Sequence, residues 1–538
     1  MRRIALLILI FSIFINLKMW SQTEISLVNE NPKENIFKND LPYTAKAYKE
    51  FQFFAFYINQ AVASNMYPQS SLFNGQLVGR LFGQNSSTTT DSLKSMYVEQ
   101  RLIPFFIYQP KLFNGRAILR ASFEIDWTWG DQAYGLSGNK GSAISADQVN
   151  LQTQNIELEL IPAKGWAINL GLQRLYDTPY NPYRTFFDKM TNTGYRLAYW
   201  GTDGVGISVR YNNDLNNIKT GFYKLYENLP EVDDDVNLFE ASYERKLNKL
   251  WNAGGSFYYV RDRGMGKGGV SVFGQGLTST LAKYNGAYSF DLGTNEYRAN
   301  IFWTGLFFSR NSEFWLDRWQ TSGFVKTNYG GIDTKENDSW GKKADVLGVA
   351  GNLRTAYRFG QTQNDYVSID LVYTSGDKNG ISDNTYSGVI TGNTWGMPAN
   401  IFIGTGSYLL FPHMNVVNRY TPLVSDISNM GYGITAGTFN IYKDIVPNKI
   451  NLKVGSAFGL STIKPENGGK TMGTEVNFAA KYSLGPFMSI ELHAAHLWLG
   501  NFYDSSDDSH GTDINGLNYD SRPVNPWTAF IAFKWLMF

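Results

Sequence analysis

Residues 115–129, GRAILRASFEIDWTW, decide the fold. Every odd-numbered position from Ala117 to Trp129 is apolar, whereas the even-numbered positions carry mainly Arg, Ser, Glu, Asp and Thr. Side chains that alternate with a period of two point to opposite faces of a β-strand. Strands of soluble proteins usually have about 5–6 residues, whereas a tilted strand crosses a bilayer in about 9–11. The stretch therefore predicts a membrane-crossing strand.

The same alternation recurs along most of the chain. It is found in residues 155–160, 166–173, 205–211, 297–307 and 367–374. In 297–307, for example, Tyr297, Ala299, Ile301 and Trp303 are expected on the lipid face and Arg298 on the lumen face. One apolar face and one polar face, repeated in strand after strand, is typical of a membrane barrel with an aqueous lumen.

The N-terminus is typical of an exported protein. Residues 1–22 combine Arg2 and Arg3 with a short apolar run, which predicts a cleaved signal peptide. Residues 23–72 are expected to form a periplasmic extension with an amphipathic helix over 45–66, which either packs against the barrel mouth or plugs the pore. The barrel is expected to occupy residues 73–538. The chain has no Cys, so disulfides, Cys-ligated metals and N-terminal lipidation of a cysteine are excluded.

Composition narrows the function classes. The net charge of +1 argues against a nucleic-acid partner. Aromatic residues make up 15% of the chain and there are 52 Gly, as expected for alternating strands with aromatic girdles. Only 4 His are present, and His493 and His496 should point to opposite faces of one strand, which excludes a shared metal. The acidic runs 377–384 and 504–520 lack the spacing of a calcium loop and are expected to be solvated loops. We expect no cofactor, no metal and no enzymatic activity.

Connections and the C-terminus complete the predicted architecture. Short turns at 162–165 and 484–486 alternate with long polar loops at 130–148 and 501–525. Residues 526–538 form a last strand that ends on Phe538, as the assembly signal of outer-membrane barrels usually does. We predict an all-β fold: a single transmembrane antiparallel up-and-down β-barrel of about 18 strands (16–20 possible), even-numbered because both termini should be periplasmic, with a short N-terminal helical extension.

Two stretches resemble the alginate-export family of outer-membrane barrels. The first is Gly171-Leu172-Gln173-Arg174 with Leu175-Tyr176-Asp177 and, after a turn, Tyr183-Arg184; the second is Tyr373-Thr374-Ser375-Gly376-Asp377. The resemblance implies an 18-stranded, Arg-lined pore for anionic polysaccharides or similar anions. It implies pore-lining roles for Arg174, Arg184 and Asp377.

Alternation independently places further charged residues on polar strand faces. These predicted pore-lining residues are Arg120, Glu124, Asp126, Arg196, Arg210, Arg298, Arg354 and Arg358. An Arg on the lipid face at the bilayer midplane would cost about 2–4 kcal/mol, so mid-strand Arg residues belong in the lumen. Two roles remain open for each Arg: setting ion selectivity, or bracing the wall by pairing with carboxylates such as Glu157, Glu159 and Asp370.

The expected function is therefore that of an outer-membrane porin or export channel in a Gram-negative bacterium. Solutes, with anionic oligo- or polysaccharides as candidates, would pass passively through the lumen. Expected partners are outer-membrane lipid, the barrel-assembly machinery through the C-terminal strand, and the solute. Two alternatives remain: a barrel that serves secretion or surface attachment, and a secreted soluble carbohydrate-binding or hydrolase β-protein.

Overall fold

A computed structural model describes most of the predicted barrel. It covers residues 50–68, 87–91, 95–129, 148–175, 203–227, 229–264, 290, 292, 295–312, 314, 316–390, 406–410, 428–429, 431–465, 468–504 and 523–537. The predicted signal peptide, the loop 130–147, most of the loop 501–525, Arg184, Arg196 and Phe538 lie outside the described residues. The side chains of Asp126 and Arg174 do so as well.

The described residues form strands and two short 3-10 helices, and none of their helices could cross a membrane. The strands are β1 (Phe51–Ser64), β2 (Met66–Pro68), β3 (Ser87–Thr89), β4 (Ser95–Tyr108), β5 (Ala117–Trp129), β6 (Gln148–Leu160), β7 (Trp166–Arg174), β8 (Asp203–Asn212), β9 (Asn216–Tyr226), β10 (Val236–Lys246), β11 (Trp251–Asp262), β12 (Tyr297–Arg310), β13 (Trp319–Glu336), β14 (Ser339–Arg358), β15 (Tyr366–Thr374), β16 (Thr385–Tyr386), β17 (Ile434–Val446), β18 (Ile450–Ser461), β19 (Thr471–Gly485), β20 (Met488–Leu499) and β21 (Trp527–Met537). The 3-10 helices are η2 (Lys111–Phe113) and η3 (Asn501–Asp504).

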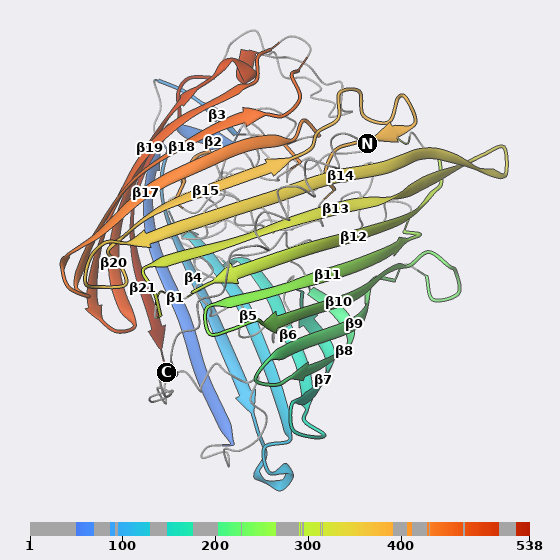
Figure 1. Cartoon of the computed structure of the whole chain (residues 1–538), viewed down its shortest axis with the longest axis horizontal. Coiled ribbons are helices and arrows are strands. Elements are labelled where there is room, and N and C mark those ends of the chain that lie inside the picture. Colours follow the sequence, from blue (N-terminus) through green and yellow to red (C-terminus); the bar gives the residue numbers. More distant parts are fainter. Residues whose placement is uncertain are drawn as a thin grey trace. The chain divides into compact units, whose positions relative to one another are not determined.

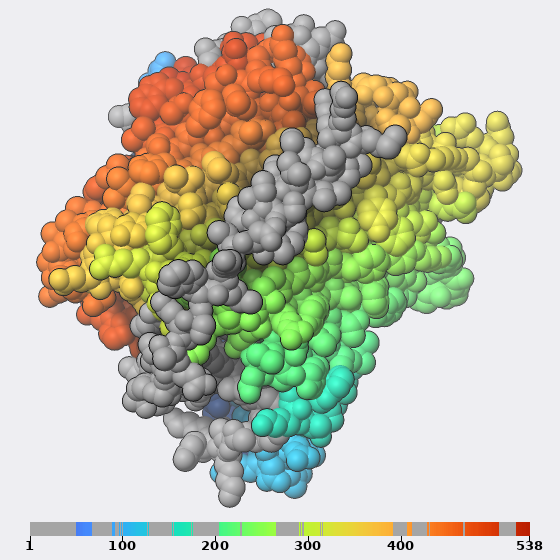
Figure 2. Space-filling model, viewed as in Figure 1, coloured from blue at the N-terminus to red at the C-terminus, as the bar shows by residue number. Residues whose placement is uncertain are grey.

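Eighteen of these strands form one closed antiparallel barrel, which confirms the predicted fold class. Each strand pairs with its neighbours in the order of the sequence, and β21 pairs with β1 to close the ring (Figure 1). β16 is not counted among the eighteen barrel strands, because it pairs only with β14 and in parallel. Figure 2 shows the strands from β10 to β19 packed side by side as a wall. Closure gives every strand two hydrogen-bonded neighbours and leaves no sheet edge.

The two ends of the barrel differ in the length of their connections. At one end, which we call the turn end, the connections are short, such as 213–215, 247–250, 447–449 and 486–487. β1 begins and β21 ends at this turn end. The connections at the other end, the loop end, are mostly long, such as 263–296 and 375–433. This asymmetry agrees with the predicted short turns and long loops.

Burial along the strands is inverted relative to a soluble barrel. On β15, Ser368, Asp370 and Thr374 are 3%, 4% and 0% exposed, whereas Leu371 and Tyr373 are 49% and 45% exposed. Successive residues alternate between the two faces of a sheet, so polar side chains line the interior and apolar side chains form the outer surface. Buried Arg120, Asn169 and Arg210 continue this pattern on β5, β7 and β8, where the sequence predicted it.

The helix predicted over residues 45–66 is wrong for its described part. Residues 51–64 are strand β1, which pairs with both β4 and β21. The interior face of β1 carries Phe54 and Ile58, and its outer face carries the exposed Phe51 and Phe53. Because both faces carry large apolar side chains, and Gln60 and Ser64 add polar groups to the interior face only further along, the alternation that identifies the other strands is weak here. The barrel wall therefore includes a segment that the sequence had placed in the periplasmic extension.

Apolar side chains do line the interior near the loop end. Tyr297, Ala299, Ile301 and Trp303 of β12 are buried and pack in a cluster with residues of the loops, including Phe290, Leu292, Ile381 and Ile390. The indole Nε1 of Trp303 donates to the backbone carbonyl of Ile390 at 2.9 Å. The predicted lipid-facing assignment of these β12 residues is wrong, because loop segments fold inward here and give apolar interior side chains a partner.

Candidate functional site in the barrel interior

A network of buried charges covers the interior wall from β5 to β8. The Arg120 guanidinium donates to Glu157 Oε1 at 3.3 Å and to Glu159 Oε1 at 3.0 Å. Glu159 Oε2 accepts from Arg210 and, at 3.3 Å, from Asn169. Buried charges are stable only when they are paired and hydrogen-bonded. This network therefore braces the wall, which is one of the two roles that the sequence left open for these arginines.

Other interior cations are paired in the same way. Arg101 lies 2.7 Å from Glu124, Lys219 lies 2.6 Å from Glu240, and Arg354 lies 3.8 Å from Asp370. Each of these pairs joins neighbouring strands. The interior face of the described wall therefore carries both signs of charge rather than an excess of arginine.

The predicted pore-lining residues with described side chains separate into three groups. Arg120, Glu124, Arg210, Arg354 and Arg358 lie on interior faces. Among the described residues, no carboxylate contacts Arg358, and its Nε is buried without a hydrogen-bond partner.

Arg298, in contrast, lies on the outer face of β12, where its Nε donates to Asp333 at 2.9 Å and its guanidinium lies 4.6 Å from the ring of Trp340. The prediction that it lines the pore is wrong. Near the loop end the outer face is polar, because the apolar side chains of β12 turn inward to meet the loops.

Asp377, the third case, lies in the connection after β15 and does not belong to the wall. Its carboxylate accepts hydrogen bonds from the backbone N–H groups of Asn379 and Ser387, at 2.9 and 2.8 Å, and from the Ser387 hydroxyl at 2.7 Å. These bonds shape the loop, so Asp377 is a structural residue of this segment.

A second loop segment, residues 406–410, is anchored to the interior face of β19. Glu475 accepts from the Ser407 hydroxyl at 2.7 Å and from the backbone N–H groups of residues 408–410 at 2.7–2.9 Å. Lys453 of β18 donates to the carbonyl of Gly406 and lies 4.4 Å from the ring of Tyr408. We call residues 406–410 the inner loop segment, because the strand side chains that hold it face the interior.

Below the inner loop segment, towards the turn end, β15 and β17 to β20 line a partly open cavity of about 240 Å³. The register brings its residues together: Tyr366 lies opposite Tyr442, Tyr442 opposite Lys453, and Ala479 opposite His493. The side chains that line it are Asn364, Tyr366, Tyr408, Tyr442, Asp444, Asn448, Lys449, Asn451, Lys453, Ala479, Lys481, Ser483, Glu491 and His493. We call it the turn-end pocket.

Hydrogen bonds fix the polar groups of the turn-end pocket. The Tyr408 hydroxyl lies 2.8 Å from Nδ1 of His493, and Nε2 of His493 lies 3.1 Å from Glu491. Lys534 donates to Glu491 at 2.7 Å. His496 lies on the other face of β20, against Trp498, as the predicted opposite orientation of the two histidines requires. The pocket is thus a rigid set of donors and acceptors.

Sequence reasoning missed every residue of the turn-end pocket as a site. Tyr366 and His493 are far apart in the chain, and only the barrel register places them on one wall. A usable signal is present: polar or tyrosine residues occupy interior positions close to short turns, as with Asp444 and Lys481. The alternation identifies the residues that face the interior, but it does not show which residues of neighbouring strands lie opposite one another.

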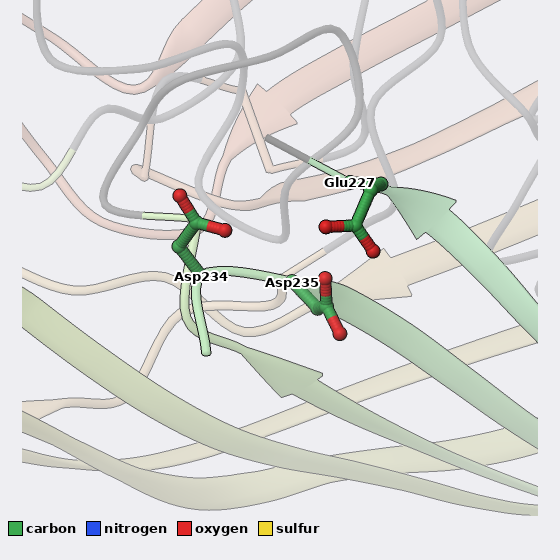
Figure 3. A group of neighbouring side chains, drawn as sticks. All are labelled: Glu227, Asp234 and Asp235. Carbon is green, nitrogen blue, oxygen red and sulfur yellow. The ribbon is translucent and has the colours of Figure 1, made fainter. Parts of the chain in front are cut away.

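Acidic side chains also gather at the loop end, between β9 and β10. Carboxylate oxygens of Glu227, Asp234 and Asp235 lie within 4.8 Å of one another (Figure 3). The ammonium of Lys224 contacts Glu227 and lies 3.1 Å from Asp235. Asp234 accepts from the backbone N–H of Leu229 at 3.2 Å. These contacts account for the grouping without a metal ion.

Comparisons with known proteins give distant structural likenesses. No protein-family model and no curated protein matches the chain. Among solved structures, Pseudomonas aeruginosa OpdQ is similar with a TM-score of 0.45 and 10% identity, over 91% of this chain and 99% of that one. Acinetobacter baumannii OccAB4 gives a TM-score of 0.42 and 11% identity, over 91% and 99%. Pseudomonas aeruginosa OccK5 (OpdH) gives 0.43 and 9%, over 90% and 99%. These values are too low to transfer a function.

Proposed function

We propose that the chain is a passive channel for small polar solutes in the outer membrane of a Gram-negative bacterium. The observation that carries this proposal is the inverted burial of the closed barrel, with apolar side chains outside and polar side chains inside. An exposed apolar belt of this extent would be unstable in water and is the surface that a bilayer covers. The turn end, where β1 begins and β21 ends, would face the periplasm.

The interior supports passage without a chemical step. The described charged pairs brace the wall, and the inner loop segment with its anchors narrows the interior. Passive channels set their selectivity by pore width and by the charges at the constriction. The C-terminal strand β21 would be the part that the assembly machinery recognises.

An anion-selective channel, for example for anionic saccharides, is a finer proposal. It is supported by the interior position of Arg358, which no described carboxylate contacts. The pairing of Arg120, Arg210 and Arg354 with carboxylates removes most of the arginine excess on which the sequence prediction depended.

Fractionation and conductance test the proposal together. We expect the protein in the outer-membrane fraction, with gel mobility that changes on heating, and stepwise conductance in a planar bilayer. A soluble periplasmic protein would contradict the barrel in the membrane, whereas a membrane-inserted barrel without conductance would contradict the channel.

A further inference from the structure

We propose that the turn-end pocket is a binding subsite for an uncharged, hydroxyl-rich solute of about one sugar ring. The inference rests on the proposed channel function, because it places the subsite on the path of the solute. It names a solute class that differs from the anionic cargo that the sequence suggested. Size, charge balance and the chemistry of the lining carry the argument.

The volume of the partly open pocket matches a small occupant. Its volume is about 240 Å³. Pockets for drug-sized ligands are larger, roughly 300–1,000 Å³. A single small ring fits this volume, whereas a saccharide chain would have to extend beyond it into the lumen.

Protein donors engage both carboxylates of the pocket. Glu491 lies 2.7 Å from Lys534 and 3.8 Å from Lys481, so one carboxylate is shared by two ammonium groups. Asp444 accepts only from neutral amide donors, at 2.9 Å from Asn451 and 3.1 Å from Asn364, and it supplies the second negative charge. A charged solute would have to disrupt these contacts, and a buried charge without a partner is costly.

The remaining cations of the lining do not offer a free charge to the interior. Lys453 is buried and donates to the carbonyl of Gly406 and to the side-chain oxygen of Asn477. The ammonium of Lys449 lies 5.8 Å from the ring of Tyr482, which is on the outer face of β19. The lining thus carries three lysines and two carboxylates, and the protein's own contacts engage these groups instead of leaving a cluster of unpaired cations for an anion.

The lining suits hydroxyl groups. Each hydroxyl of a polyol both donates and accepts, and the pocket offers amides, carboxylates and tyrosine hydroxyls that do the same. The rings of Tyr366 and Tyr442 are stacked at 4.4 Å, with 19° between their planes, and form a rigid aromatic wall on one side. Rigid aromatic side chains with a polar tip supply contact area at low entropic cost.

Three probes of equal ring size test the charge preference: D-glucose, D-glucuronate and D-glucosamine. Binding to the purified full-length protein in detergent micelles would be measured by saturation-transfer NMR titration. We expect glucose to bind, and each charged derivative to bind at least about tenfold more weakly, which is about 1.4 kcal/mol. Equal or tighter binding of glucuronate or glucosamine, or no binding of any probe, would overturn the proposal.

Two substitutions on β15 locate the binding. Tyr366 faces the pocket and Tyr373 faces outward, so Tyr366→Leu should weaken glucose binding about tenfold while Tyr373→Leu leaves it unchanged, a difference of about 1.4 kcal/mol. Heat-modifiable gel mobility checks folding of both, and Tyr442→Leu, which removes the other ring of the stacked pair and should weaken glucose binding equally, replaces Tyr366→Leu if that variant does not fold. Equal effects of the two positions would place glucose outside the pocket.

Conductance of the same preparation separates this inference from the channel proposal. A conducting barrel that does not bind glucose keeps the channel and removes the subsite. A barrel that binds glucose at this pocket but does not conduct keeps the subsite and removes the channel.

Discussion

The Glu475 carboxylate holds the inner loop segment by accepting from the Ser407 hydroxyl and from the N–H groups of Tyr408, Leu409 and Leu410. A buried donor that loses its acceptor costs about 1–3 kcal/mol. We expect Glu475→Ala to release the segment. The amide exchange protection of residues 408–410 should fall at least about tenfold, as a loss of 1.4 kcal/mol or more requires.

Glu244 provides the control for this substitution. It is also buried on an interior face, on β10, but has no contact with the inner loop segment among its described hydrogen bonds. Glu244→Ala should leave exchange at residues 408–410 unchanged. Unchanged protection in Glu475→Ala would mean that the segment is held by Lys453 and the tyrosine contacts alone.

The contacts of Asp365, in the turn between β14 and β15, predict that the stability of the folded protein falls at acidic pH. Burial favours a higher pKa, but the backbone N–H of Asp444 at 2.8 Å, the Lys443 ammonium at 3.1 Å and the N–H of Thr362 outweigh it and lower the pKa of this carboxyl. A lowered pKa in the folded state stabilises the fold above the ordinary value of 3.8, and this contribution is lost as the pH falls through the lowered pKa.

The measurement is the urea midpoint of unfolding at pH 7 and at pH 3. At pH 7, Asp365→Asn should unfold at a lower urea concentration than the wild type. Its urea midpoint should also fall less than that of the wild type between pH 7 and pH 3. Asp338, in the hairpin between β13 and β14, is 99% exposed, so Asp338→Asn serves as the control. If the urea midpoint of Asp365→Asn fell as much as that of the wild type, the loss of stability in acid would be due to other carboxylates.

At the scale of the strand, alternation predicted faces correctly where each face meets a single environment. β5, β7, β8 and β15 place their polar side chains inside, as expected. β12 and β1 were the failures, for two physical reasons. The interior face of β12 meets apolar side chains of folded-in loops, and β1 carries large apolar side chains on both faces. A period of two identifies two faces, but the environment of each face depends on distant parts of the chain.

A substitution at the middle of β15 tests whether lipid covers the outer face. Leu371 is 49% exposed and lies between Ile369 and Tyr373 on that face. We expect Leu371→Arg to lower the free energy of unfolding from phospholipid vesicles by about 2–4 kcal/mol, the cost of an Arg at the midplane. Val232, in the β9–β10 connection, is similarly exposed at 51%, and Val232→Arg should have little effect. A Leu371→Arg protein that is equally stable, or more soluble without detergent, would contradict a membrane-covered face.

At the scale of the molecule, the sequence predicted a closed barrel of about 18 strands, with 16–20 possible, but it did not predict the composition of the interior. Adjacent strands can be predicted from chain order, since each pairs with the next. The partners of an interior charge depend on the register, which fixes, for example, Arg354 opposite Asp370. The sequence left pairing and selectivity as alternatives for each arginine. The alternation shows that an arginine faces the interior, but it does not show which residues of the neighbouring strands lie opposite it.

Arg358 and Arg298 are a matched pair for testing which arginines the permeating ions sense. The sequence predicted both in the lumen, whereas the structure places Arg358 inside near the turn end and Arg298 outside, bound to Asp333. Replacing Arg358 by Glu changes the interior by two unit charges, which at about 8 Å in water is about 1 kcal/mol for a monovalent ion. This energy has opposite signs for K⁺ and Cl⁻, so the ratio of their permeabilities changes by about 2 kcal/mol. We therefore expect Arg358→Glu to raise the permeability of K⁺ relative to Cl⁻ about thirtyfold at low salt, measured by the reversal potential in a KCl gradient. The shift should shrink at high salt, because screening shortens the reach of the charge. Arg298→Glu should leave the reversal potential unchanged, and an equal shift in both variants would mean that ions pass outside the interior face assigned to Arg358.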